Sequence, residues 1–135
     1  MGGCSNEQEE KGNVVKTRKK DEKATKQTHE LTLTDSNFAK ETSKGVVLVD
    51  FYAPWCGPCR TQGPIIAKVA AAMVGQATVG KCNVDEEPKS AKRFGVRSIP
   101  TLLVLKDGKE VERFVGAQSE AELIAVLKRH IEPKQ

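Results

Sequence analysis

Two cysteines separated by two residues are the chemically most distinctive feature of the sequence. They lie in the segment Trp55-Cys56-Gly57-Pro58-Cys59, directly after an apolar run and at the start of a helical pattern. Thiols at this spacing can close a small disulfide ring, and the free N–H groups and partial positive charge of a helix N-terminus favour the thiolate form of Cys56. Cys59 lies one turn further into the helix, where we expect it to be more buried and suited to resolving a mixed disulfide.

A zinc site is the other chemistry that this spacing allows. A structural zinc ion takes four ligands, of which the two cysteines would supply half. The remaining cysteines and histidines of the chain are Cys4, Cys82, His29 and His130. None of these is paired with another at a ligand spacing, so the sequence favours redox chemistry over metal binding, and we expect no bound metal.

A carboxylate precedes the cysteines on the apolar run. Asp50 lies six residues before Cys56, between apolar neighbours. An ionised carboxylate that is buried without a partner is costly, so this position predicts a raised pKa and a task in proton transfer. The other interpretation is a structural carboxylate that accepts hydrogen bonds from the backbone.

The elements that must position these groups follow from periodicity. The expected strands cover residues 31–33, 46–53, 77–84, 101–105 and 110–115. The expected helices start at Thr34, at the cysteine pair, near Lys89 and at Ser119. Residues 46–53 are nearly all apolar and rich in β-branched side chains, which is typical of a strand buried on both faces. The order β-α-β-α-β-α-β-β-α predicts an α/β fold, with a mixed central β-sheet flanked by helices on both faces.

Two short signals fix the C-terminal part of this arrangement. Asp107-Gly108 separates the last two expected strands and predicts a tight hairpin turn. Ser119, followed three residues later by Glu122, predicts a capping box at the start of the last helix.

Composition restricts the class of protein further. The chain has 135 residues, a net charge of +4 and 4% aromatic residues, which argues against a dedicated nucleic-acid binder. It contains no run of 18 apolar residues that would span a membrane. Residues 1–29 hold five apolar residues and no aromatic residue, so we expect a disordered charged tail or tether there, followed by one domain over residues 30–135.

The first residues leave the cellular location open. Gly2 resembles a myristoylation start, although Asn6 stands where that pattern has Ser or Thr. Cys4, preceded by small residues and followed by a charged linker, resembles the start of a mature bacterial lipoprotein to which Met1 has been added. An ordinary N-terminus with a free thiol fits the same residues equally well.

Several motifs in a fixed order resemble the thioredoxin family. Residues 51–59 read Phe-Tyr-Ala-Pro-Trp-Cys-Gly-Pro-Cys, and residues 98–101 read Ser-Ile-Pro-Thr. The similarity runs from about Leu31 to Ile131 and includes the strand end at residues 81–85 and the Val115-Gly116 pair. It implies a thioredoxin fold and a protein-disulfide reductase that takes part in electron transport and cell redox homeostasis.

The resemblance also implies a role for individual residues. Cys56 corresponds to the attacking thiol and Cys59 to the resolving thiol. Asp50 corresponds to the residue that assists deprotonation of the buried cysteine. Lys81 matches the lysine that lies near it; the alternative interpretation is an exposed charge at a strand end. Pro100 matches the family's cis-proline, and the backbone of Ile99 would bind an extended substrate segment.

A flat apolar rim around the reactive sulfur is the implied substrate-binding surface. Its members would be Trp55, Gly57, Pro58, Ile99, Pro100, Gly116 and Ala117. Such a surface suits many protein disulfides rather than one small molecule. Thr61, Gln62 and Gly63 stand where the family usually carries bulkier apolar residues. Gly63, together with Pro64, should loosen the helix just beyond the cysteines, and this loosening would alter the choice of partner.

The implied partners follow from the Gly-Pro pair between the cysteines, which resembles reducing members of the family. We expect a monomer that acts on disulfide-containing substrate proteins. We expect it to bind neither a cofactor nor nucleic acid. Electrons would come from a thioredoxin reductase that uses NADPH in the cytoplasm, or from a membrane thiol relay if Cys4 anchors a lipoprotein facing the periplasm or exterior. The alternatives are a tethered disulfide oxidant or isomerase, and a protein-binding module that uses the rim.

Overall fold

The computed structural model of the chain describes residues 29–131. The expected tail therefore lies outside the described residues except for His29, and so do the lipid-attachment candidates Gly2 and Cys4. The tail and the boundaries of the domain stay predictions.

Within residues 29–131, five strands form one central sheet, as the sequence predicted. In spatial order they are β1 (Leu31–Thr32), β3 (Thr78–Asn83), β2 (Val46–Tyr52), β4 (Thr101–Lys106) and β5 (Lys109–Val115). The pairs β1–β3 and β2–β3 are parallel, whereas β2–β4 and β4–β5 are antiparallel. The sheet is thus mixed, and β2 lies at its centre.

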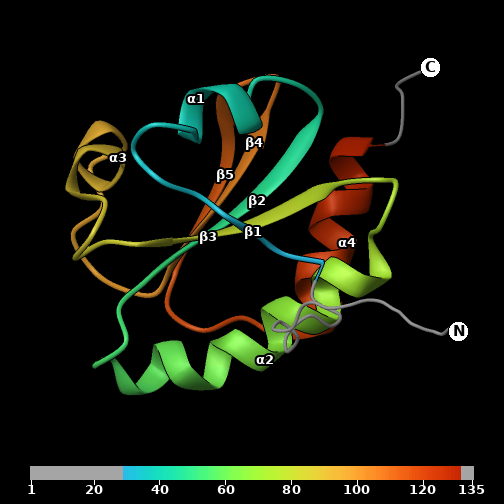
Figure 1. Cartoon of the computed structure of the whole chain (residues 1–135). Coiled ribbons are helices and arrows are strands. Elements are labelled where there is room, and N and C mark those ends of the chain that lie inside the picture. The colour runs from blue at the N-terminus through green and yellow to red at the C-terminus, as the bar shows by residue number, and fades with distance from the viewer. Residues whose placement is uncertain (1–28, 132–135) are drawn as a thin grey trace, which may run out of the picture.

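In the part of the chain that the structure describes, four helices cover the two faces of the sheet. They are α1 (Phe38–Glu41), α2 (Gly57–Ala72), α3 (Pro88–Arg93) and α4 (Glu120–Ile131). Helices α1 and α3 lie on one side and α2 and α4 on the other (Figure 1). The chain order of strands and helices is the predicted one, and the fold class is confirmed.

The central strand β2 divides the core into two layers by simple alternation. Val47, Val49 and Phe51 pack in the cluster that includes Phe38 of α1 and is flanked by α3. Val46 and Leu48 pack in the other cluster, with residues of α2 and α4. Both sets are buried, which confirms the prediction of a strand covered on both faces. Asp50 lies two residues beyond Leu48 on the same strand, so its side chain is on the same face of the sheet as Val46 and Leu48, the face that α2 covers.

The start of the first helix was predicted wrongly. The sequence placed it at Thr34, but α1 begins at Phe38 with Asn37 as its N-cap residue. Asn37 Oδ1 accepts a hydrogen bond from Thr34 N at 2.7 Å, and Thr34 Oγ1 accepts one from Asn37 N at 3.2 Å. This is the reciprocal bonding of a capping box, and Phe38 N also donates to Thr34 O at 2.9 Å. Thr34 therefore caps a turn over residues 35–37, and the regular helix begins only after that turn.

Both short signals near the C-terminus are confirmed. Asp107 and Gly108 have φ angles of 51° and 86°, the left-handed conformation that a two-residue hairpin turn between β4 and β5 requires. Glu122 N donates to Ser119 Oγ at 3.1 Å, and Ser119 N donates to Glu122 Oε1 at 3.3 Å. This capping box sets the start of α4.

Candidate active site

The two cysteines lie at the N-terminus of α2, at the point where the chain leaves the carboxyl end of β2. Cys56 is the N-cap residue, and its Sγ accepts a hydrogen bond from Cys59 N at 3.2 Å. Both residues are free thiols. A backbone donor aimed at Cys56 Sγ stabilises negative charge on that sulfur, as an attacking thiol requires.

Cys59 lies one turn further into α2, and its thiol resists ionisation. Burial raises the pKa of the Cys59 thiol, and the hydrogen bond to Cys56 adds to this effect. Its exposed fraction is 4%, against 6% for Cys56, so the predicted difference in burial is small. The two thiols are distinguished by their hydrogen bonding, and Cys59 needs a base to lose its proton near neutral pH.

Asp50 has the surroundings that such a base needs. It is 2% exposed, and its Oδ1 has no hydrogen-bond partner among the described residues. Burial raises its pKa from 3.8 to about 7; the charge of Glu30 adds to this increase and that of Lys81 opposes it. The unpartnered oxygen argues against a purely structural carboxylate bonded to the backbone.

Lys81 lies beside Asp50 in the register of β2 and β3. Its Nζ is 3.6 Å from Glu30 Oε1 and 5.8 Å from the centroid of the Tyr52 ring, and its side chain is 43% exposed. Lys81 is therefore a half-exposed charge that is paired with Glu30 and acts on Asp50 through its field. The sequence analysis missed Glu30, because only the pairing of β1 with β3 brings the start of the domain to this place.

One cavity of about 180 Å³ is lined by both Asp50 and Cys59. Its lining residues are Asp50, Tyr52, Ala53, Pro54, Cys59, Arg60, Gly63 and Lys81. A space of this size with polar groups in its wall can hold water, which can carry protons between groups that do not touch. The carboxyl group of Asp50 and the thiol of Cys59, both with a raised pKa, thus line one cavity through which water can carry a proton from one to the other.

A loop at the start of β4 approaches the first cysteine. The Ile99–Pro100 peptide bond is cis, as expected, and Ile99 O lies 3.8 Å from Cys56 Sγ. Gly116 N, at the end of β5, donates to Pro100 O at 2.8 Å. Residues far apart in the sequence are in this way assembled around one sulfur atom.

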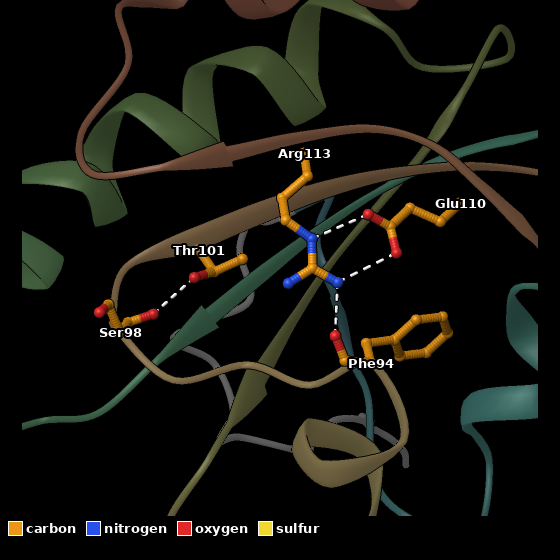
Figure 2. Close-up of polar contacts among 5 residues, drawn as sticks. All are labelled: Phe94, Ser98, Thr101, Glu110 and Arg113. Carbon is orange, nitrogen blue, oxygen red and sulfur yellow. Dashed lines mark hydrogen bonds and ion pairs between the residues drawn. The ribbon is translucent and has the colours of Figure 1, made fainter.

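Side chains outside the predicted site hold this loop in place (Figure 2). Thr101 Oγ1 donates to Ser98 O across the cis-proline. Arg113 of β5 donates to the carbonyl of Phe94 at the end of α3, and it is itself held by Glu110 at 2.8 and 3.0 Å. The sequence analysis missed Arg113, since a charged residue on an edge strand usually faces solvent and no local signal marks its backbone partner.

The predicted rim residues differ in exposure. Trp55 is 66% exposed, and its indole N–H donates to Asp85 Oδ2 at 2.8 Å, a partner that the sequence analysis did not identify. Gly57, Pro58 and Ala117 are exposed, and Ile99 and Gly116 are partly exposed. Pro100 is buried, so it supports the rim from below and offers little surface of its own.

Residues 29–131 show neither a metal-binding cluster nor a membrane-spanning helix. That part of the chain holds no group of three or more His, Cys, Asp or Glu side chains arranged to bind a metal ion. It also holds no helix whose length and apolar character would let it cross a membrane.

Comparisons with known proteins agree with this geometry. The sequence model of the family described as "Thioredoxin" matches residues 29–129. The chain is 46% identical to the thioredoxin of Staphylococcus haemolyticus over 99 residues, which is 73% of this chain and 95% of that protein. It is also 46% identical to the thioredoxin of Bacillus subtilis over 98 residues, 73% of this chain and 94% of that protein.

A solved structure shows the same fold. A mutant thioredoxin from Halobacterium salinarum NRC-1 superimposes with a TM-score of 0.72 at 35% identity, covering 82% of this chain and 99% of that one. Thioredoxins carry no prosthetic cofactor and act through a redox-active disulfide. On its sequence, its fold and its paired cysteines, the chain belongs to the thioredoxin family of protein thiol–disulfide oxidoreductases.

Proposed function

We propose that this chain reduces disulfides of other proteins, with Cys56 as the attacking thiol and Cys59 as the resolving thiol. The observation that carries the proposal is the position of Cys56 Sγ. It accepts the Cys59 N–H at the helix N-terminus and lies 3.8 Å from Ile99 O, beside the rim where a substrate would bind. Asp50 is the base for the second step, and Lys81 tunes it through its charge.

The first step forms a mixed disulfide. The Cys56 thiolate attacks one sulfur of the substrate disulfide, a bond forms between Cys56 and that sulfur, and the other substrate sulfur leaves as a thiolate that takes a proton from solvent. An extended substrate segment binds along the rim made by Trp55, Gly57, Pro58, Ile99, Pro100, Gly116 and Ala117. The backbone of Ile99 offers a short edge for strand-like pairing.

The second step releases the substrate. The Cys59 proton passes to Asp50, directly or through water in the shared cavity, and the Cys59 thiolate attacks Cys56 Sγ. The Cys56–Cys59 disulfide forms, and the second substrate sulfur leaves and is protonated. The substrate gains two electrons and two protons, and the enzyme is left oxidised. With a pKa of about 7, Asp50 can both accept and return a proton near neutral pH.

A thioredoxin reductase that draws electrons from NADPH regenerates the dithiol, and the chain acts as a monomer in the cytoplasm. The strong similarity to bacterial thioredoxins supports this assignment. A mass spectrum of the native N-terminus tests the location: an unmodified start agrees with it. A lipid on Cys4 would contradict it and indicate a tethered protein served by a membrane thiol relay.

Insulin reduction in the presence of NADPH and a bacterial thioredoxin reductase tests the activity. The wild-type protein should turn over, and Cys56→Ser should abolish the reaction. Cys59→Ser should trap a mixed disulfide with the substrate. A double Cys56→Ser, Cys59→Ser variant that keeps the biological effect would instead support a binding module.

The reduction potential of the Cys56–Cys59 pair tests the direction of the reaction. Equilibration with a glutathione buffer should give a value near about −270 mV, as for a reductant. A value of about −120 to −180 mV would contradict the proposal, because it is typical of disulfide oxidants and isomerases.

A further inference from the structure

Gln62 is a polar side chain buried in the middle of α2. Its exposed fraction is 0%, and it lies three residues beyond Cys59, on the helix that carries both cysteines. Its Nε2 donates to Gln118 O at 3.0 Å, and its Oε1 accepts from Gln118 N at 2.7 Å. Both polar groups of the amide thus bind the backbone of one residue 56 positions away.

This pair of bonds ties two parts of the site together. Gln118 belongs to the loop between β5 and α4, directly after the rim residues Gly116 and Ala117. The same loop is bonded at its other end, because Gly116 N donates to Pro100 O at 2.8 Å. The loop is therefore held at one end by the cis-proline segment and at the other by the cysteine-bearing helix.

A buried amide with both groups satisfied specifies geometry more strongly than an apolar side chain in its place. An apolar residue would fill the same volume, but it would leave the N–H and C=O of Gln118 without these partners. The loop could then move away from α2, and the rim around Cys56 would lose its fixed width.

We infer that Gln62 is a positioning residue that holds the Gly116–Ala117 side of the rim against the cysteine helix, and so favours binding of extended protein segments. The inference rests on the proposed use of this rim by protein substrates. Gln62 leaves the intrinsic reactivity of the dithiol unchanged, because its hydrogen bonds go to the loop and not to either sulfur.

The test compares Gln62→Met, which keeps the length of the side chain but not its hydrogen bonds, with Thr61→Ala, a change at the exposed neighbouring position. In Gln62→Met we expect KM for insulin to rise roughly tenfold, the effect of losing bonds worth about 1.4 kcal/mol. We expect kcat, the reaction with glutathione disulfide and the reduction potential to stay at wild-type values. Thr61→Ala should match the wild type in all four.

Equal losses with insulin and glutathione disulfide would overturn the inference, since they would place the effect at the dithiol. An unchanged KM for insulin would overturn it as well. Amide hydrogen exchange of the wild-type protein is a second test that needs no variant. The Gln118 N–H should be protected from exchange by its hydrogen bond to Gln62. Exchange as fast as that of a solvent-exposed amide would overturn the inference. If the wild-type protein failed to reduce insulin while its Gln118 N–H was protected from exchange, the result would contradict the proposed function but not the contact between Gln62 and Gln118.

Discussion

At the scale of single residues, Asp50 makes a contribution to stability that depends on pH. Its pKa is about 7 in the folded protein against an ordinary value of 3.8, chiefly because of burial. The unfolded chain therefore releases this proton more readily. Ionisation of this one group therefore makes folding less favourable as pH rises from about 4 to about 7, and its cost then stays constant at higher pH.

Replacing Asp50 with asparagine removes this ionisation at similar volume. We expect Asp50→Asn to be more stable than the wild type by up to about 4 kcal/mol above pH 7. The gain should shrink toward zero near pH 4. Urea unfolding of the reduced proteins at pH 4, 6 and 8 measures it. A gain that is independent of pH would show that ionisation of Asp50 is not its source.

Cys82 provides a contrast to the cysteines of the site. It is 0% exposed, on the face of β3 that packs against the cluster with Phe51. Burial raises its pKa to about 12, and the charges of Glu87 and Asp35 add to that effect. Cys82 thus packs as a small buried hydrophobic residue.

We therefore expect Cys82 to resist alkylation in the folded protein. Iodoacetamide should modify Cys56 readily at pH 8 and Cys82 only in urea, which peptide mass mapping of the reduced protein would resolve. Modification of Cys82 at a rate comparable to that of Cys56 under native conditions would contradict the prediction. It would support a regulatory thiol instead.

Whether the sequence indicates a functional residue depends on how rarely its local sequence pattern occurs without a function. Cys56, Cys59 and Asp50 could be singled out as candidates, because thiols at this spacing and a carboxylate in an apolar strand seldom occur without a chemical role. Gln62 and Arg113 could not be assigned their roles, because both bind backbone atoms of distant loops. Residues of these types usually face solvent, and a backbone partner leaves no trace in the sequence.

At the scale of elements, the close approach of β1 and β3 restricts Gly80. A Cβ atom built there would lie 2.7 Å from Cδ1 and 2.9 Å from Cγ of Leu33, which is 1% exposed and has little room to move. We expect Gly80→Ala to destabilise the protein by about 1–3 kcal/mol, because overpacking pushes β1 away from the sheet.

Gly63 is the matched control on α2. A Cβ atom there meets nothing within 4 Å, and the residue lies inside a helix. Gly63→Ala should stabilise the protein by about 0.5–1 kcal/mol through helix propensity. Guanidinium unfolding of both variants measures the two effects. Equal changes in the two variants would show that contact with Leu33 does not set the cost at Gly80.

The elements themselves differ in how well the sequence predicts them. The strand over 46–53 was recognisable because it is covered on both faces and reads as one apolar run. Thr34 does cap a first turn, but the regular helix starts only at Phe38, and periodicity does not register the turn between them. Local signals thus identify a buried strand and a capping residue, but they do not fix where the regular helix begins.

At the scale of the whole molecule, the topology gathers the site at one end of the sheet. The cysteines follow the carboxyl end of β2, the usual place for sites in open α/β sheets. Because β4 runs antiparallel to β2, its start brings Ile99 and Pro100 to the same end, and the end of β5 adds Gly116. Segments that are far apart in the sequence meet here. The sequence therefore indicated the residues of the site but not the distances between them.

The packing also predicts that residues 1–28 can be removed. The buried members of both large hydrophobic clusters lie between Leu33 and Leu127, and the family match begins at residue 29. A protein that begins at residue 29 should keep the wild-type Tm and the wild-type kcat/KM for insulin. A lower Tm would show that the removed residues contribute to the fold.

A shorter protein that begins at residue 34 is the informative counterpart. It lacks β1, the buried Leu33, and Glu30, whose charge helps to raise the pKa of Asp50. We expect a clear loss of Tm, and in the folded fraction a lower pH midpoint for ionisation of Asp50, followed by the NMR shift of its carboxyl carbon. The first strand would then be needed for both the sheet and the tuning of the base. An unchanged Tm and midpoint would assign both properties to the strands from β2 onward.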